Sequence, residues 1–147
     1  MRDFVRHAVL AVLAACVTQG AQAMEAAGAK QVIDKFLASQ SQPQATADAV
    51  QHVIADVNAD GKPDIVLMWN VLGPTYSYSK LTLFLDQGRS YRALTAELNG
   101  QTERLTVKGS DILVDTLMLG PNDPRCCPTR KVQMHFRWQG DKLVTFK

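Results

Sequence analysis

The chain lacks most of the features that mark specialised classes of protein. It has three cysteines among 147 residues, and its 16 Lys and Arg nearly balance its 14 Asp and Glu. Basic residues are scattered rather than clustered, which argues against a nucleic-acid-binding surface. No G-x-S-x-G or H-E-x-x-H motif is present, so no familiar catalytic set is available. Length and an apolar fraction of 46% instead predict one globular domain, and the sequence favours a non-enzymatic role.

The N-terminus has the three parts of an export signal. Arg2 and Arg6 supply positive charge, residues 8–17 are uniformly apolar, and Ala21-Gln22-Ala23 places small residues before a cleavage point. The apolar run is too short to span a bilayer, which takes roughly 20 residues. We therefore predict a signal peptide over residues 1–23 and a single exported domain over residues 24–147, periplasmic or secreted.

A second processing pattern overlaps the first. Leu13-Ala14-Ala15-Cys16 is similar to the lipobox of bacterial lipoproteins, in which the cysteine becomes the lipidated first residue. A lipoprotein signal over residues 1–15 would leave acyl chains on Cys16 and hold the protein on a membrane. Both alternatives stay open from the sequence, and Cys16 is the only membrane attachment that it suggests.

Periodicity predicts one helix followed by strands. Apolar residues recur at helical spacing from residue 29 to residue 37, and the helix should end near Ser39. From Val50 onward, alternating apolar residues and turn dipeptides such as Asn99-Gly100 predict short strands. The nearly continuous apolar run in residues 64–71 predicts a central strand buried on both faces. The expected fold class is α+β, with an N-terminal helix packed on an antiparallel β-meander of about eight strands.

Residues 56–64 read D-x-N-x-D-G-x-x-D, which is the spacing of a loop that wraps a hard cation. Gly61 permits the left-handed backbone that such a loop needs. The motif predicts a structural Ca²⁺ site, and the alternative is a metal-free turn stabilised by its own polar side chains. The candidate ligands are Asp56, Asn58, Asp60, the carbonyl of Lys62, and Asp64.

The stretch from Ile54 to Met68 resembles the calcium loops of integrin-type β-propeller blades and related FG-GAP repeats. In those families the loop joins two strands and the unit is repeated several times. This chain contains the motif once. The resemblance therefore implies a calcium-binding loop between strands and does not imply a propeller.

Cys126 and Cys127 are adjacent, and they are the only cysteines left after removal of an N-terminal signal peptide. Export would place them in an oxidising compartment. A bridge between neighbours is strained, because adjacent Cα atoms lie about 3.8 Å apart, below the usual range for disulfides. Three alternatives remain: a vicinal disulfide that stiffens a recognition loop, intermolecular bridges or free thiols, and a redox site. The C-x-x-C spacing of thiol oxidoreductases is absent.

The segment G-P-N-D-P-R-C-C-P-T and the following strand H-F-R-W-Q-G-D-K-L-V resemble the LppP/LprE family of bacterial exported lipoproteins. That family has a D-P-x-C-C-P-S segment before a strand with a similar aromatic ending, and Thr129 stands here in place of Ser. The match covers the chain from Leu119 to Val144. It implies export, a small β-rich domain and support for lipidation at Cys16, and it implies no reaction.

Tyr76 and Tyr78 lie in G-P-T-Y-S-Y-S, an expected irregular connection. They are candidates for a binding lip, and ordinary packing of a long hairpin loop is the alternative. The leading hypothesis is a binding or structural-interaction module of the cell envelope, with these tyrosines and the Cys126–Cys127 loop as its surface. The partner, a protein or another ligand, is not identified by the sequence. The alternative is a periplasmic thiol-redox factor or envelope enzyme that uses Cys126 and Cys127.

Overall fold

A computed structural model describes residues 27–146 of the chain. The expected signal peptide and the lipidation candidate Cys16 therefore lie outside the described residues. The described part forms one helix and eight strands, all paired in antiparallel fashion. The expected α+β class with a β-meander is confirmed. Within the same part of the chain, no helix is both long and apolar enough to cross a membrane.

The helix covers residues 27–40, close to its predicted bounds. Ala29, Ile33 and Leu37 are buried, as the i, i+4, i+8 spacing requires. Near the end of the helix, the Phe36 ring meets two rings of the sheet edge-to-face, with centroids 5.4 Å from Trp69 and 5.0 Å from Phe84. Such aromatic pairs add specific stabilisation to the area that they bury.

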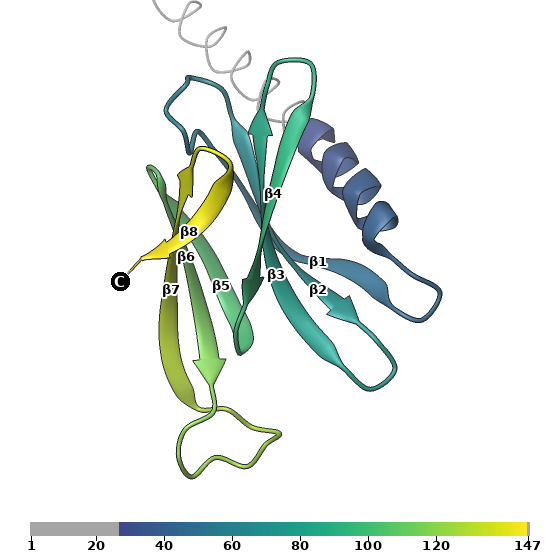
Figure 1. Cartoon of the computed structure of the whole chain (residues 1–147), viewed down its shortest axis with the longest axis vertical. Coiled ribbons are helices and arrows are strands. Elements are labelled where there is room, and N and C mark those ends of the chain that lie inside the picture. The colour runs from purple at the N-terminus through teal and green to yellow at the C-terminus, as the bar shows by residue number, and fades with distance from the viewer. Residues whose placement is uncertain (1–26, 147) are drawn as a thin grey trace, which may run out of the picture. The chain divides into compact units, whose positions relative to one another are not determined.

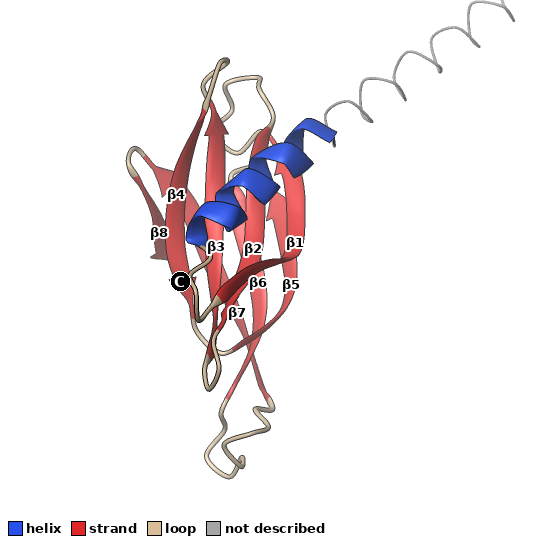
Figure 2. Ribbon diagram, turned by 90° about the vertical axis from the view of Figure 1, so that its right-hand side faces the viewer, coloured by secondary structure: helices blue, strands red, loops and turns tan. Residues whose placement is uncertain are grey.

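The strands form two four-stranded sheets rather than one continuous sheet, each a meander in sequence order (Figure 1). Figure 2 shows the two sheets as layers, with β1–β4 in front of β5–β7. The first sheet contains β1 (Thr46–Ala55), β2 (Asp64–Leu72), β3 (Ser77–Asp86) and β4 (Tyr91–Leu98); the second contains β5 (Gln101–Lys108), β6 (Asp111–Met118), β7 (Arg130–Gln139) and β8 (Lys142–Phe146).

The main core lies between the sheets. Val66 and Met68 of β2 and Leu81 and Leu83 of β3 are fully buried there, together with Phe136 of β7. Alternate residues of β2 face the other way, and they are buried as well. The prediction that β2 is a central strand buried on both faces is thus confirmed, because it lies between β1 and β3.

The predicted turn at Asn99-Gly100 joins two strands that do not pair with each other. It carries the chain from β4 in the first sheet to β5 in the second. Gly100 has a φ of +81°, and a Cβ atom there would lie 2.4 Å from the Leu117 carbonyl oxygen. The glycine is therefore required by close approach to β6 as well as by its backbone conformation.

Strand β1 of the first sheet contacts β5 of the second, and one side chain joins the two strands. The β1 register shifts between Ala49 and Gln51, as in a β-bulge. The Gln51 carboxamide then donates to the Leu105 carbonyl oxygen at 3.0 Å and accepts from the Leu105 N–H at 2.9 Å. Gln51 thus joins β1 to β5 with the two hydrogen bonds that a backbone strand would make.

Candidate functional site

The loop between β6 and β7 is organised by Asp123. This carboxylate accepts hydrogen bonds from the Gly120 N–H at 2.8 Å and the Thr129 N–H at 2.7 Å, and also from the Thr129 hydroxyl. The two ends of the loop are thereby tied to one side chain. These bonds, that from Gly120 first, hold the pKa of Asp123 below its ordinary value of 3.8.

Cys126 and Cys127 lie at the exposed tip of this loop. Their Sγ atoms face each other with a Cβ–Sγ–Sγ–Cβ angle of −100°, and their Cα atoms are 3.8 Å apart. The Cys127 N–H donates to the Pro124 carbonyl oxygen at 3.0 Å, so a tight turn presents the pair. The sequence predicted an irregular loop here. The hydrogen bonds to Asp123 (the Asp123 clamp) and this turn give the loop a defined conformation.

The two tyrosines do not share one irregular connection. Tyr76 lies in the β2–β3 turn, whereas Tyr78 belongs to β3 and pairs with Val71. Their rings are stacked, with centroids 6.0 Å apart, and about half of Tyr76 is exposed. A Cβ atom on Gly73 would lie within 2.6 Å of the Tyr76 ring. The β2–β3 turn is therefore tighter than the sequence suggested, because Gly73 lets the ring fold back over the chain.

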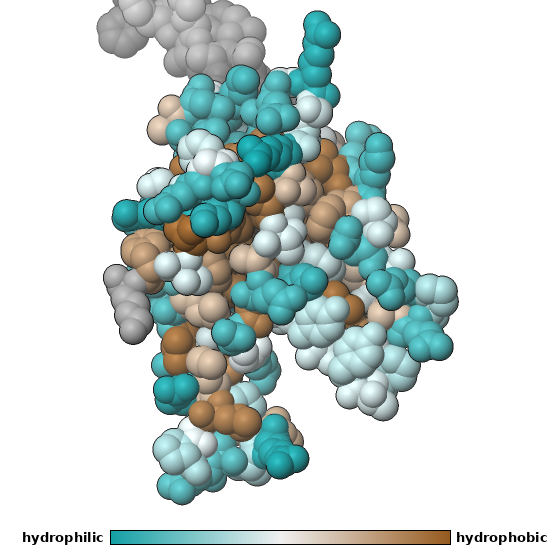
Figure 3. Space-filling view, in the orientation of Figure 1, coloured by the Kyte–Doolittle hydropathy of each residue, from teal (hydrophilic) through white to brown (hydrophobic). Residues whose placement is uncertain are grey.

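Tyr78 and Cys126 border one cleft of about 650 Å³. Figure 3 shows a hollow at the end of the molecule, between the β2–β3 turn and the β6–β7 loop. Tyr76 instead lines a smaller hollow of about 100 Å³, which Tyr78 also borders. The structure thus brings one tyrosine to the cysteine loop and leaves the other on the adjoining face. The cleft is lined by Ser77, Tyr78, Leu98, Asn99, Gly100, Gln101, Leu117, Leu119, Arg125, Cys126 and Pro128.

The chemistry of this lining is polar with one formal charge. Arg125 supplies that charge, Asn99 and Gln101 add carboxamides, and no acidic residue lines the cleft. Leu119 and Tyr78 are the exposed apolar side chains beside it. A few polar groups among apolar surfaces are typical of ligand sites.

Sequence reasoning did not single out Arg125, Leu119 or the clamp residue Asp123. Arg125 and Asp123 flank Pro124 immediately before the cysteines, so their position in the loop was visible. The role of Asp123 could have been found from an Asp inside, and a Thr at the end of, a proline-rich loop, because such side chains commonly bond nearby backbone groups. The cleft could not, since it needs the packing of two sheets.

The predicted cation loop closes on itself through backbone amides. Asp56 accepts from the Asp60 N–H at 3.1 Å and the Gly61 N–H at 2.9 Å. Asn58 also accepts from the Asp60 N–H, and Asp60 accepts from the Lys62 N–H. The hydrogen bonds that the Asp60 carboxylate accepts from the Lys62 N–H and then from the Asn58 carboxamide keep the pKa of Asp60 below its ordinary value. Ala59 and Gly61 have φ angles of 59° and 82°, which turn the amides inward.

Asp64 differs from the other candidate ligands because it is fully buried. Its two carboxylate oxygens accept from the Val57 N–H at 3.0 Å and the Asp86 N–H at 2.9 Å. Burial raises the pKa of Asp64 above 3.8, and the two amide bonds oppose that rise. Asp64 therefore links the β1–β2 loop to the end of β3.

These residues fit a cation in part. Asp56 and Asn58 each accept from the Asp60 N–H, so their oxygens lie close together, and each oxygen keeps a second lone pair, which suits a hard cation such as Ca²⁺. Asp64 is turned toward the core. Within residues 27–146, no three acidic, His or Cys side chains converge as a metal-binding group. The residues available to bind a cation are therefore fewer than the sequence predicted, because Asp64 is not among them.

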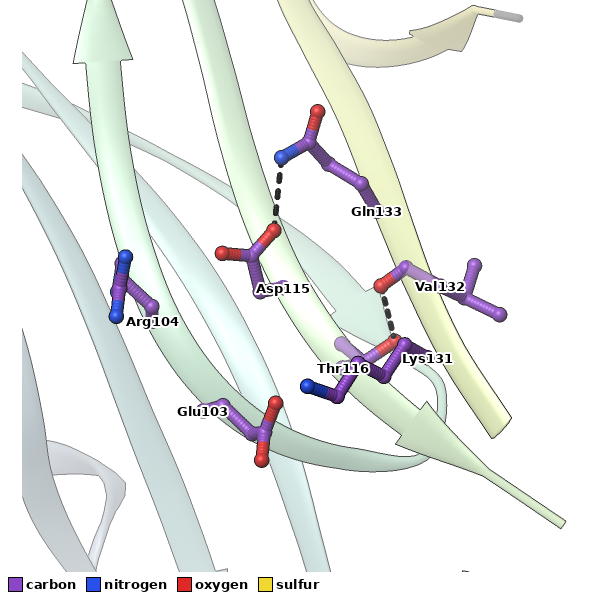
Figure 4. Close-up of a pocket in the computed structure, with 7 residues that line it drawn as sticks. All are labelled: Glu103, Arg104, Asp115, Thr116, Lys131, Val132 and Gln133. Atoms are coloured by element: carbon purple, nitrogen blue, oxygen red, sulfur yellow. Dashed lines mark hydrogen bonds between the residues drawn. The ribbon is translucent and has the colours of Figure 1, made fainter. Parts of the chain in front are cut away.

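Another hollow, of about 630 Å³, lies on the outer face of the second sheet (Figure 4). Asp115 accepts a hydrogen bond from Gln133 there at 2.7 Å, while Glu103, Arg104 and Lys131 lie around it. Because charges of both signs line this hollow, it does not select a ligand by charge.

Comparison with known proteins finds no matching family model, no matching curated protein and no matching solved structure. The resemblances to the LppP/LprE family and to FG-GAP loops therefore stay predictions.

Proposed function

We propose that the protein is an exported binding module of the cell envelope, and that the cleft between Tyr78 and Cys126 is its binding site. The main support is that two segments singled out in the sequence border one hollow of about 650 Å³. Concave sites of this size are typical of ligand binding. The hydrogen bonds that Asp123 accepts support the proposal further, because they fix the β6–β7 loop, which forms one wall of the cleft, before a ligand arrives.

The lining favours a ligand that carries a carboxylate and an apolar part. Arg125 is the one charged residue on the wall, and a guanidinium can bind a carboxylate through two parallel hydrogen bonds. Leu119 and Tyr78 offer apolar contact area beside it. A ligand of this class can be a small molecule or a segment of an envelope protein.

The test compares a cleft variant with a surface control. Arg125→Glu combined with Leu119→Asp changes the cleft, whereas Arg89→Glu changes an exposed charge in the β3–β4 turn at the opposite end of the strands. Each immobilised protein is exposed to an envelope extract, and retained molecules are identified by mass spectrometry. A molecule retained by the wild type and by Arg89→Glu, and lost by the cleft variant, supports the site. Equal retention by all three rejects it.

Export and the state of the cysteines are part of the same proposal. Cys126 and Cys127 form a vicinal disulfide that stiffens the cleft wall, and their facing Sγ atoms support this pairing. The intact mass of the protein recovered from cells tests both points. Cleavage after Ala23 and acylation at Cys16 give different masses, and a disulfide lowers the mass by two hydrogens. A full-length, reduced chain rejects the proposal.

A thiol-redox function is the second candidate, supported by the exposure of both cysteines. In that reaction a substrate dithiol would be oxidised to a disulfide while the Cys126–Cys127 bond is reduced to two thiols. The wild type should then oxidise a model dithiol, and Cys126→Ser should not. Absence of this exchange in the wild type leaves binding as the proposed function.

A structural Ca²⁺ held by Asp56, Asn58, Asp60 and the Lys62 carbonyl is the remaining part of the proposal. At a calcium concentration tenfold above Kd, mass action adds about 1.4 kcal/mol of stability. Thermal unfolding with calcium and with a chelator measures this change. Asp56→Ala should abolish it, and Asp48→Ala, at an exposed carboxylate of β1, should preserve it. Identical melting temperatures with calcium and with chelator in the wild type would rule the site out.

A further inference from the structure

Strand β7 has a free edge over half of its length. On one side it pairs with β6 from Arg130 to Phe136. On the other side it pairs with β8 only from His135 to Gln139. Across the part of the chain that the structure describes, no strand covers the second side of residues 130–134. Backbone N–H and C=O groups on such an edge are available to another extended chain.

A hollow of about 520 Å³ lies beside this edge. It is bordered by the end of β8, by the middle of β7 and by the corner between the sheets. Met134 is only partly buried against the core at this point. An added strand would continue the line of β8, fill the hollow and cover Met134. The hollow is lined by Asn99, Gln133, Met134, His135, Thr145 and Phe146.

The charge on the edge strand is of one sign. β7 carries Arg130, Lys131 and Arg137 and no acidic residue, and β8 carries Lys142 and none. Arg137 is paired with Asp111 of β6, whereas no ion pair is formed by Arg130 or Lys131 within residues 27–146. The free part of the edge therefore carries two basic side chains that are complementary to an acidic chain, although Lys131 shares the outer-face hollow with Glu103 and Asp115.

We propose that residues 130–134 of β7 accept an extended acidic peptide of a partner protein, which adds to the second sheet as a further strand. Backbone hydrogen bonds supply the affinity, and acidic side chains opposite Arg130 and Lys131 supply the preference. A second copy of this chain is a poorer occupant, because its edge brings more basic residues and no acidic residue to the same site. The site is distinct from the proposed carboxylate-binding cleft, although Asn99 borders both hollows.

The competing explanation is that Arg130 and Lys131 guard the edge against pairing, as charged residues do in many β-proteins. A direct binding experiment separates the two. The probes are fluorescent peptides of about eight residues, long enough to cover the free edge, with two adjacent Glu residues among Val, so that one Glu can lie on each face of the sheet. One control peptide replaces Glu by Lys, and another carries N-methyl groups on alternate backbone nitrogens.

The expected result is saturable binding of the Glu peptide, with slowed amide hydrogen exchange in residues 130–134. The N-methylated peptide should not bind, because it cannot form the ladder. The double variant Arg130→Glu and Lys131→Glu should weaken the Glu peptide about tenfold and favour the Lys peptide. Lys108→Glu, at the far end of β5, should leave affinity within about twofold.

Three outcomes would overturn the proposal. The first is no saturation of the Glu peptide at about 1 mM, the weakest affinity of interest. The second is equal binding of the N-methylated peptide. The third is a dimer in sedimentation whose residues 130–134 are protected without peptide, which would make a second copy the occupant. None of these outcomes bears on the Arg125 cleft, which the comparison with Arg89→Glu tests separately.

Discussion

The β1–β2 loop and the β6–β7 loop are held by the same device in opposite surroundings. In each loop, one aspartate accepts hydrogen bonds from two backbone N–H groups. Asp64 uses both carboxylate oxygens, whereas Asp123 uses one oxygen for both. Asp64 is fully buried, and burial raises its pKa. Asp123 is only partly buried, and its hydrogen bonds lower its pKa. The surroundings of the aspartate therefore decide whether its charged or its neutral form is favoured.

The two clamps also differ in what they join. Asp64 links a residue of its own loop, Val57, to Asp86, which lies 22 residues further along the chain. Asp123 links Gly120 to Thr129, the two ends of a single loop. Loss of the first should weaken the whole fold, whereas loss of the second should loosen one loop. Four experiments test this difference.

Asp64→Asn should have the largest effect. The asparagine keeps one acceptor oxygen and turns an NH₂ group toward a backbone N–H, which leaves a buried donor unsatisfied. We expect a loss of about 3 kcal/mol in the free energy of unfolding, measured by urea denaturation. Asp48→Asn, on the exposed face of β1, is the control and should stay within about 0.5 kcal/mol of wild type. Equal stability of the two variants would contradict the assigned role of Asp64.

The pH dependence of stability should have opposite signs for the two clamps. Because the folded pKa of Asp64 lies above 3.8, its contribution is greatest below that pH and falls as pH rises through the folded value. Because the folded pKa of Asp123 lies below 3.8, its contribution is present above that pH and falls as pH drops through the folded value.

Urea denaturation of the wild type, Asp64→Asn and Asp123→Asn in chelator, across acidic pH, measures this difference. Subtracting each variant from the wild type should give two slopes of opposite sign. Two slopes of the same sign would show that the clamps sense similar surroundings.

Asp123→Asn should act locally. The amide oxygen can still accept from both backbone N–H groups, which donate to one oxygen of Asp123. As a neutral acceptor it binds them more weakly, and its NH₂ group replaces the oxygen that accepts from the Thr129 hydroxyl. Hydrogen exchange should speed up at Gly120 and Thr129, while the urea midpoint of the whole domain changes less than in Asp64→Asn. A fall in global stability as large as that of Asp64→Asn would show that the loop is part of the cooperative core.

Replacing both cysteines by serine should change global stability least. A bridge between neighbours closes almost no chain, so the change should be within about 0.5 kcal/mol. The same variant should show faster hydrogen exchange around residues 125–128 if the pair stiffens the tip. Unchanged exchange there would assign the stiffness of the loop to the Asp123 clamp alone.

Much of the fold was predictable because it depends on local sequence patterns. The helix, the eight strands and the buried strand β2 follow from apolar periodicity and turn residues. The division into two sheets was not predicted. Asn99-Gly100 has the sequence of a hairpin turn, yet it joins strands of two different sheets. That outcome depends on residues far along the chain, such as Leu117, which lies against Gly100.

The candidate site was predictable in its segments and not in its arrangement. The motif at residues 56–64 predicted Asp64 to be a metal ligand, but the Asp64 side chain is buried in the core. The spacing of a motif cannot show that the first residue of a strand points inward. Tyr78 was expected in a loop, but its pairing with Val71 makes it part of β3. Arg125 gains interest only because the packing of the two sheets places it on the cleft wall.

The hydrogen bonds from Gln51 to Leu105 have a consequence for the ageing of the protein. Deamidation of Gln51 would convert the donor NH₂ into a carboxylate oxygen and set it against the Leu105 carbonyl. One spontaneous hydrolysis would thus leave only the hydrogen bond from the Leu105 N–H between these two residues and would weaken the junction of β1 and β5.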